Sequence, residues 1–366
     1  MSERDYRRST FHGFKPYVAG KPIEEVEREL GLSIPIAKLA SNENPLGPSP
    51  KAIAAIQEIL PRLHLYPHDD SWYYRQAVAR HHGVAFEEVF GAAGSVEVIE
   101  LCAHVFLEAG DQVVTSEKTF AIYTLATMKA GADLVRVPCR DRYWYDLEAI
   151  RARITPRTKL IFLANPNNPT GTWFSRDAFD AFMESIPEDI LVVYDEAYCH
   201  YITRDDLPDA WAWLQKGRDV LILRTFSKSH GLAGLRLGYA VGPARIVSGL
   251  IQGRTAFNLS SLAQAAGVAA LEDTEFVERS RRFNAGEMAW MGEALQDLPV
   301  TVPPSQTNFY LVDTDRDAQV LFGELQKRGV IVRPMGGYQM PHAIRVNMGL
   351  RAENERFVEA LGALLR

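Results

Sequence analysis

The chain has 366 residues, of which 47% are hydrophobic and 23% are charged. This composition is that of an ordinary soluble globular protein and excludes a disordered or fibrous chain, and the length suggests about two domains. Lys and Arg total 40 against 46 Asp and Glu, so the net charge of −6 disfavours a nucleic-acid binder, which would normally carry a basic surplus.

Three cysteines, Cys102, Cys139 and Cys199, stand far apart in the sequence. An odd number of widely spaced cysteines predicts no disulfide framework and favours a reducing cytoplasm. Every long apolar run is interrupted by a charge or a proline before it reaches membrane-spanning length. We therefore expect a cytoplasmic protein that binds neither membrane nor nucleic acid.

Residues 1–43 are rich in proline and glycine around one short helix, which predicts an N-terminal arm that lies on another surface. Between residues 44 and 250, short β-branched runs alternate with segments of helical periodicity, such as Val96–Phe106, Tyr123–Met128 and Phe179–Phe182. Near-continuous apolar strands separated by helices indicate a parallel sheet covered on both faces, whose ligands gather at the carboxyl ends of the strands. The predicted strands are Val113–Val114, Leu134–Val137, Leu160–Leu163, Ile190–Tyr194, Val220–Leu223 and Tyr239–Val241.

The pattern changes at about Thr274, and residues 251–366 predict a smaller α+β domain. Its expected helices are Glu275–Leu295, Ala318–Lys327 and Glu353–Leu365. Its expected strands are Asn308–Val312, Val330–Val332 and Ile344–Val346.

The strongest chemical signal follows the predicted strand Val220–Leu223. Thr225, Ser227 and Lys228 come next, and a glycine-rich stretch leads from them to Arg236. A lysine at the mouth of a parallel sheet suits a Schiff base with a phosphate-bearing aldehyde cofactor, whose phosphate the hydroxyls and the guanidinium would hold. The alternative is a surface lysine in a glycine-rich loop.

Polar residues also follow two other predicted strands. Asp195 and Tyr198 come after one of them, and Asn168 lies in the turn Asn165–Gly171 after the other. Asp195 would keep a pyridine nitrogen protonated through a charge-assisted hydrogen bond, while Tyr198 and Asn168 would donate to the phenolic oxygen of the ring. The alternatives are an acid that caps a nearby helix and an ordinary Asn-Pro turn.

A fourth signal is the small-residue turn Gly91–Ser95, which opens the predicted helix Val96–Phe106. N–H groups at the start of a helix bind phosphate, so Gly94, Ser95 and Val96 are candidates for a phosphate site. A tight connection without a ligand is the alternative. All four signals fall at predicted strand–helix junctions, which chance seldom produces.

With these motifs in this order, the chain resembles the fold-type I aminotransferases that use pyridoxal 5′-phosphate, and more narrowly the histidinol-phosphate aminotransferase family. The resemblance covers nearly the whole chain. It implies an α/β fold with a large domain on a mostly parallel seven-stranded sheet, a smaller α+β domain and an N-terminal arm. It rests on Pro16–Val18, Gly20–Pro22, Leu39–Pro50, Leu65–Pro67, Asn165–Gly171, Tyr194–Tyr198, Thr225–Tyr239, Phe257–Asn258, Thr307–Phe309 and Val330–Pro334.

The resemblance implies that Lys228 binds the cofactor as a Schiff base and, once the incoming amino acid frees it, moves the α-proton of the substrate. Lys228, Asp195 and Tyr198 form the implied catalytic set. Phe120 would stack on the pyridine face, unless it is only a core aromatic residue. The implied cofactor-binding residues are Gly94, Ser95, Val96, Phe120, Asn168, Asp195, Tyr198, Thr225, Ser227, Lys228, Arg236 and Tyr66.

The resemblance also implies a substrate site. Arg345 would bind the α-carboxylate of the substrate through two parallel hydrogen bonds, assisted by Asn168, and Arg333 would bind its distal phosphate. Tyr66 would reach across a subunit interface to the phosphate of the neighbouring cofactor, and Tyr17 in the arm could cover the substrate side chain. Ordinary surface pairing or packing is the alternative for Arg333 and Tyr66.

Three positions depart from the family pattern. Val96 stands where an acid is usual, His230 stands where an aromatic ring is usual, and Asn347–Leu350 lacks the usual hydroxyls. None of these belongs to the catalytic set. No metal site is expected, because His64, His68 and the neighbouring acids lack a second cluster that could complete a coordination sphere.

The expected activity is ping-pong transamination between an amino donor, histidinol phosphate, and a 2-oxo acid acceptor such as 2-oxoglutarate, by a homodimer that uses pyridoxal 5′-phosphate. An aromatic amino acid aminotransferase is the first alternative. A decarboxylase of a phosphorylated amino acid is the second. A non-catalytic regulatory module that binds the cofactor ranks far below them, because such proteins usually carry a DNA-binding domain ahead of this fold.

Overall fold

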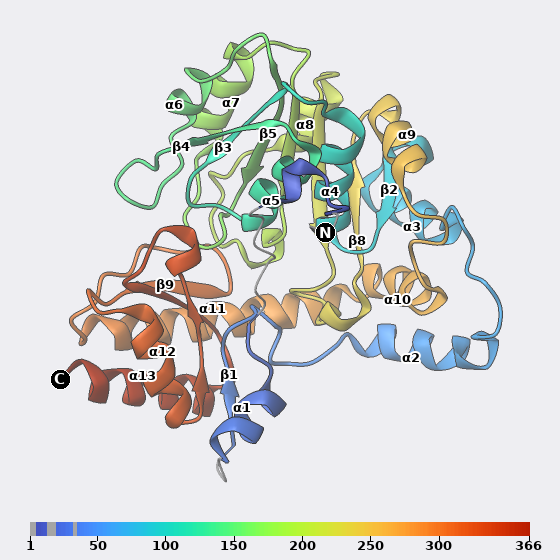
Figure 1. The fold of residues 1–366 in the computed structure, drawn as a ribbon. Coiled ribbons are helices and arrows are strands. Elements are labelled where there is room, and N and C mark those ends of the chain that lie inside the picture. The colour runs from blue at the N-terminus through green and yellow to red at the C-terminus, as the bar shows by residue number, and fades with distance from the viewer. Residues whose placement is uncertain (1–4, 13–19, 32–34) are drawn as a thin grey trace.

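The computed structural model describes residues 5–12, 20–31 and 35–366, and its centre is a seven-stranded sheet (Figure 1). The strands lie in the order β2-β8-β7-β6-β5-β3-β4, and neighbours are parallel except where β8 pairs with β7 and β2. The expected mostly parallel sheet is confirmed. Its strands are β2 (Val89–Ala92), β3 (Gln112–Ser116), β4 (Asp133–Val137), β5 (Thr158–Ala164), β6 (Leu191–Asp195), β7 (Val220–Thr225) and β8 (Gly238–Val241).

Both faces of this sheet are buried, which explains its near-continuous apolar strands. Along β6, Val192 and Tyr194 belong to one apolar core, whereas Leu191 and Val193 belong to the other. Successive side chains of a strand point to opposite faces, so both sets must be apolar.

Helices cover both cores, and among those of the described residues none is long and apolar enough for a membrane span. One core is covered by α2 (Pro50–Ile59), α3 (Trp72–His82), α6 (Leu147–Arg151), α7 (Arg176–Ser185), α8 (Ala210–Gln215) and α10 (Ser261–Leu271). The other is covered by α4 (Ser95–Phe106), α5 (Ala121–Ala130) and α9 (Ala244–Gly253).

Strand β2 occupies part of the segment that the sequence indicates as a small-residue turn. A side chain at Gly91 would place its Cβ 3.2 Å from the Tyr74 ring and 3.1 Å from Leu259, which is tighter than most Cβ contacts, so close packing favours glycine there. Small residues at closely packed positions look like turn residues in a sequence, so the sequence does not indicate this strand. The turn itself begins after Ala92, where α4 is about to start.

The second unit contains a three-stranded antiparallel sheet in the order β11-β12-β9, together with a parallel pair of β1 and β10. The expected strand at 330–332 divides in two because β10 pairs with β1, whereas β11 turns to β12. The elements are β1 (Ala37–Lys38), α11 (Thr274–Gln296), β9 (Phe309–Asp313), α12 (Ala318–Lys327), β10 (Val330–Ile331), β11 (Arg333–Pro334), β12 (Ala343–Asn347) and α13 (Arg351–Leu365).

The described N-terminal residues contact both units: residues 5–12 lie beside α5 of the large unit, whereas residues 20–31 and 35–40 pack on the second unit (Figure 1). Helix α1 (Ile23–Leu30) buries Val26 against Ala40 and Ile331, and β1 pairs with β10. Six short 3₁₀ helices complete the described elements: η1 (Ser9–Phe11), η2 (Leu60–Arg62), η3 (Phe86–Glu88), η4 (Cys199–Tyr201), η5 (Ala233–Leu235) and η6 (Gly336–Tyr338).

Helix α10 follows the expected border between the domains, which lies between residues 250 and 251. Its residues Ala263, Ala266 and Ala270 belong to the same apolar core as the strands of the large sheet. The expected border therefore falls before a helix that packs with the large unit. The division into residues 1–43, 44–250 and 251–366 stays a proposal.

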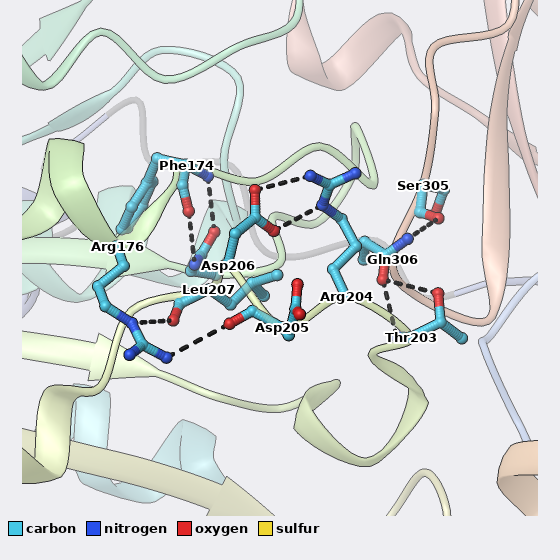
Figure 2. A network of polar contacts seen from close by, with 10 residues as sticks. Phe174, Arg176, Thr203, Arg204, Asp205, Asp206, Leu207, Ser305 and Gln306 are labelled. Carbon is cyan, nitrogen blue, oxygen red and sulfur yellow. Dashed lines mark hydrogen bonds and ion pairs between the residues drawn. The ribbon is translucent and has the colours of Figure 1, made fainter.

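Polar contacts join the two units beside the carboxyl edge of the large sheet (Figure 2). Gln306, which precedes β9, accepts hydrogen bonds through Oε1 from the Thr203 backbone N–H at 2.9 Å and from the Thr203 hydroxyl at 3.2 Å. The backbone N–H of Gln306 donates to the Gly171 carbonyl at 3.0 Å. A Cβ at Gly171 would come within 2.4 Å of the Ser305 hydroxyl, so glycine is needed for this approach.

Candidate active site

A cavity of about 270 Å³ opens at the carboxyl edge of the large sheet. Strands β5, β6 and β7 end at Ala164, Asp195 and Thr225, and all three residues line it. Such an edge is where open α/β sheets bind ligands. The second unit supplies Arg333 and Arg345 to the same cavity.

Asp195, the last residue of β6, is 5% exposed. Its carboxylate accepts a hydrogen bond from the Tyr123 hydroxyl at 2.8 Å and one from the Ala197 backbone N–H at 3.0 Å. Burial raises the pKa of Asp195 to about 6, against the lowering effect of these two donors. Because a cation beside a buried carboxylate favours its ionised form, a protonated ring nitrogen in the cavity would be a matching partner.

Lys228 follows β7 and is half-buried in the wall of the cavity. Burial, aided by the positive charges of Arg345 and Arg236, lowers the pKa of the Lys228 amine to about 7. The Nζ atom donates to the Ser41 carbonyl at 3.3 Å and lies 5.8 Å from the centre of the Tyr198 ring. An amine with this pKa has a substantial neutral fraction near pH 7, and the neutral form can act as a nucleophile and as a base.

Hydroxyl, guanidinium and helix-terminal groups lie together in the wall of the cavity and form what we call the phosphate cradle. The hydroxyls of Thr225 and Ser227 lie 3.0 Å apart, and Arg236 donates toward Ser227 at 3.5 Å. Opposite them begins α4, whose N-terminus is capped by no side chain of the described residues. A helix N-terminus with unfilled N–H groups favours an anion.

Gly94 brings the guanidinium close to the start of α4. Its φ of +80° is one that side-chain-bearing residues rarely adopt, and a Cβ there would lie 2.7 Å from Nη2 of Arg236. Glycine is therefore required for the cationic group and the N–H groups to face one anion.

The phenol of Tyr198 is buried and fixed by Asn42, whose side-chain amide donates to its hydroxyl oxygen at 2.8 Å. Burial raises the pKa of Tyr198 to about 12, so this hydroxyl stays protonated and can donate a hydrogen bond into the cavity. The backbone N–H of Asn42 is in turn bound to the side-chain oxygen of Asn347 at 2.9 Å. Asn347, one of the departures from the family pattern, thus helps to hold the tyrosine.

Two arginines of the second unit stand directly opposite one another. Arg333 on β11 and Arg345 on β12 are register partners in the antiparallel sheet. Arg345 is 7% exposed and donates to the Asn168 side-chain oxygen at 2.6 Å and to the Ala40 carbonyl at 2.9 Å. The pair gives the cavity two adjacent cationic groups, which suits ligands with two anionic groups.

The family model described as "Aminotransferase class I and II" matches residues 34–361. The chain belongs to the class I and II aminotransferases. A protein of Anaeromyxobacter sp. (strain Fw109-5) named histidinol-phosphate aminotransferase is 47% identical, over 96% of this chain and 96% of its own. One of that name from Moorella thermoacetica is 43% identical, over 98% and 92%.

This aminotransferase is also similar to a crystal structure of histidinol-phosphate aminotransferase from Sinorhizobium meliloti in complex with pyridoxal-5′-phosphate. The TM-score is 0.91 and the identity is 30%, with 100% of this chain and 99% of that chain covered. The narrower resemblance to the histidinol-phosphate aminotransferase family and the expected α/β fold are both confirmed.

The residues of the aminotransferase cavity fit pyridoxal 5′-phosphate. That cofactor has an aldehyde, a phosphate and a pyridine nitrogen. Lys228 offers an amine of lowered pKa to the aldehyde, and Asp195 offers a buried carboxylate to the pyridine nitrogen. The cradle of Thr225, Ser227 and Arg236 beside the start of α4 offers donors to the phosphate.

The cavity brings together most of the residues that the sequence singled out, while their contacts with the cofactor stay predictions. Gly94 lies beside it against Arg236. Tyr17 is outside the described residues. Those that line it are Ser95, Val96, Phe120, Asn168, Asp195, Tyr198, Thr225, Ser227, Lys228, Arg236, Arg333 and Arg345.

Tyr66 lies on a different surface, which we call the Tyr66 face and define as Leu65, Tyr66, Tyr73 and Phe257. Tyr66 is 84% exposed, and its ring stacks on Phe257 at a centroid distance of 4.9 Å. Leu65, Tyr66 and Tyr73 line a surface depression of about 520 Å³. Within a single chain the structure therefore does not bring Tyr66 to the cavity.

Two supporting residues escape the sequence analysis, Tyr123 for Asp195 and Asn42 for Tyr198. Tyr123 is fully buried on α5 and looks like an ordinary core residue in the sequence. Asn42 has a left-handed φ of 56°, which asparagine tolerates better than most residues, but the sequence does not indicate that angle. Its place in the Leu39–Pro50 motif assigns the segment to the family pattern but does not indicate the contact with Tyr198.

Proposed function

We propose that this protein transfers the amino group of histidinol phosphate to 2-oxoglutarate with pyridoxal 5′-phosphate as its cofactor. The observation that carries the proposal is one cavity in which Lys228, Asp195 and the phosphate cradle face the pair Arg333 and Arg345. The names and high identity of the relatives support the same activity. Three free cysteines support a cytoplasmic location.

The lysine is the residue that moves protons. When bound, pyridoxal 5′-phosphate supplies an electron-withdrawing ring that stabilises negative charge on the substrate carbon that loses its proton. With its pKa lowered to about 7, Lys228 can take up that proton near neutral pH and then release it. Asp195 holds its negative charge against the ring nitrogen, and Tyr123 keeps the carboxylate in place.

The arginine pair explains how one site could serve both substrates. Histidinol phosphate has a phosphate and no α-carboxylate, whereas 2-oxoglutarate has two carboxylates. We assign the substrate phosphate to Arg333 and the α-carboxylate to Arg345, which Asn168 and Ala40 hold in position. Two cationic groups on paired strands allow each substrate to use them in its own way.

The active unit is proposed to be a homodimer. The Tyr66 face exposes aromatic and aliphatic side chains that a second copy would bury: Leu65 is 50%, Tyr66 84%, Tyr73 67% and Phe257 43% exposed. Exposed aromatic residues gathered in this way are typical of interfaces. Tyr66 of one subunit would then reach the phosphate cradle of the other, in line with its implied role.

Steady-state assays of the purified enzyme with 2-oxoglutarate test the substrate. We expect turnover of histidinol phosphate with a kcat/KM at least about 100-fold above that of phenylalanine or tyrosine, because only the phosphate uses Arg333 fully. Arg333→Gln should raise the KM for histidinol phosphate much more than that for phenylalanine.

Good turnover of phenylalanine and none of histidinol phosphate would transfer the function to the aromatic aminotransferases. Release of carbon dioxide without a keto product would instead identify a decarboxylase. Both outcomes can be read in the same reaction mixtures, by product chromatography and gas trapping.

A further inference from the structure

Lys228 opens a turn that ends at Gly231, which we call the lysine turn. Three polar side chains in and beside it form what we call the histidine–serine cluster: His200, Ser229 and His230. The Ser229 hydroxyl lies 3.0 Å from Nδ1 of His200 and 3.3 Å from Nδ1 of His230. Ser229 is 1% exposed and His230 is 5% exposed, and the two rings meet edge to face with centroids 5.1 Å apart. The mechanism above uses none of the three.

The cluster can form without a buried charge. Burial, aided by neighbouring histidines and then by Arg224, lowers the pKa of His230 to about 4 and that of His200 well below its usual value. Both rings are therefore neutral near pH 7, with one N–H each. If the two rings have opposite tautomers, the Ser229 hydroxyl donates to one ring and accepts from the other, which satisfies both contacts.

The cluster joins two turns that carry site residues. His200 lies in η4, which directly follows Tyr198, and Ser229 directly follows Lys228. Tyr198 and Lys228 meet in the cavity, where the lysine Nζ is 5.8 Å from the centre of the tyrosine ring. A hydrogen bond between the two turns therefore restrains how far apart the turns lie from which both side chains enter the cavity.

On its other side, the lysine turn is held by the loop before α2. Asn44 donates to the Ser229 carbonyl at 2.9 Å, and the Ser49 N–H donates to the His230 carbonyl at 3.0 Å. A Cβ at Gly231 would lie 2.0 Å from the Gly47 carbonyl oxygen, so the two loops are in close contact. The Ser229 hydroxyl adds the matching restraint from the side of η4.

We propose that Ser229, held between His200 and His230, is a positioning residue for Lys228. This inference rests on the proposed function, because it concerns the lysine that binds pyridoxal 5′-phosphate. Without the hydroxyl, the lysine turn loses its restraint toward Tyr198, and a misplacement of about 1 Å can cost up to about 100-fold in rate. Substrate binding depends on Arg333 and Arg345 and should change little.

The His230 ring offers a way to separate packing from hydrogen bonding. It packs on Phe226 with a centroid distance of 4.7 Å. Phenylalanine at this position keeps a ring of similar size and loses the Nδ1 contact with Ser229. His230→Phe therefore removes one of the two hydrogen bonds of the cluster, whereas Ser229→Ala removes both.

The test compares Ser229→Ala and His230→Phe with the wild type and with Ser185→Ala. Ser185 is a control away from the cavity: it is exposed, and its hydroxyl bonds within α7 to the Phe182 carbonyl. For Ser229→Ala we expect kcat to fall about 10-fold with KM changed by less than about twofold. His230→Phe should lower kcat less, and Ser185→Ala should leave it unchanged.

A second measurement reports on the lysine itself. In the cofactor-free protein, the pH dependence of Lys228 acetylation, followed by mass spectrometry, gives the pKa of its amine, which burial lowers to about 7. A loosened turn should admit water to the amine, so Ser229→Ala is expected to raise this pKa. The visible absorption of the enzyme loaded with pyridoxal 5′-phosphate should shift its pH midpoint as well.

An unchanged kcat in Ser229→Ala, or a lower kcat with both titrations unchanged, would overturn the positioning role. If Ser229→Ala does not fold, the same readouts on His230→Phe decide the question. The proposed function fails separately: in that case the wild type itself would show no absorption band that depends on Lys228.

Discussion

The cavity at the carboxyl edge of the large sheet and the Tyr66 face are built in opposite ways. In the cavity, Asp195 and Arg345 are 5% and 7% exposed, and each is held by hydrogen bonds from the same chain. On the Tyr66 face, the tyrosine is 84% exposed and its ring rests on Phe257. The first region carries charged groups and the second carries apolar ones.

The difference separates what one chain completes from what it leaves to a partner. A buried charge is costly unless its partners are built beside it, so the cavity must be organised within the fold. An exposed aromatic ring has little effect on the stability of a single chain and becomes useful when a second surface covers it. Substitutions in the cavity should therefore affect chemistry, and those on the Tyr66 face should affect assembly or the site of the partner subunit.

The largest effect is expected for Lys228→Ala. Without the amine, the site loses both its nucleophile and its base, and kcat should fall by about 10⁴-fold or more. The absorption band that depends on Lys228 should be lost from the loaded enzyme. Lys327→Ala removes a surface lysine that pairs with Glu324 and serves as the control. Turnover near the wild-type value in Lys228→Ala would remove the lysine from the mechanism.

Asp195→Asn is expected to be next in size. The amide keeps the volume of the side chain but cannot keep the negative charge, so kcat should fall by about 100- to 1,000-fold. Tyr123→Phe, which removes only the donor to Asp195, should cost much less. Stopped-flow spectra of both variants would locate the affected step. Equal losses in the two variants would contradict the assigned order of importance.

On the Tyr66 face, Phe257→Ser should weaken the dimer by about 10- to 100-fold in Kd. Because Phe257 is 43% exposed, the stability of the single chain should change little. Val320→Ser is the matched control, since Val320 is 66% exposed on α12 of the second unit. Sedimentation equilibrium distinguishes the outcomes. An unaltered dimer would place the interface elsewhere, and a monomeric wild type would contradict the proposed homodimer.

The smallest effect is expected for Tyr66→Phe, which removes one hydroxyl and retains the ring. The dimer should persist, and the Kd for pyridoxal 5′-phosphate should rise by about 10-fold through loss of a hydrogen bond to an anion. Tyr73→Phe on the same face is the control. Cofactor release measured by fluorescence would give the Kd for pyridoxal 5′-phosphate in both variants. Equal affinities in the two variants would exclude Tyr66 from the phosphate site.

The sequence predicts the large sheet and the cavity well, because both follow from local patterns. Runs such as Leu160–Leu163 are apolar at every position since both faces of β5 are buried, and each motif stands at the end of a strand. The sequence does not predict strand β2, because Gly91, which the close packing against Tyr74 favours, looks like a turn residue.

Contacts between distant segments are what the sequence does not predict. Asn42 reaches Tyr198 across 156 positions, and Tyr123 reaches Asp195 across 72 positions. Neither spacing has a periodic pattern, because each contact depends on how whole elements pack. The cluster of His200, Ser229 and His230 is of the same kind: the sequence marks His230 as unusual, and only the structure shows the serine beside it.

The most direct test of the account is to locate the covalent bond to the cofactor. The enzyme loaded with pyridoxal 5′-phosphate would be reduced with borohydride, digested and analysed by mass spectrometry. We predict the added mass of the reduced cofactor on the peptide that contains Lys228, and on no other lysine. Absence of that mass, or its presence on a different lysine, would contradict the assignment of Lys228 as the residue that binds the cofactor.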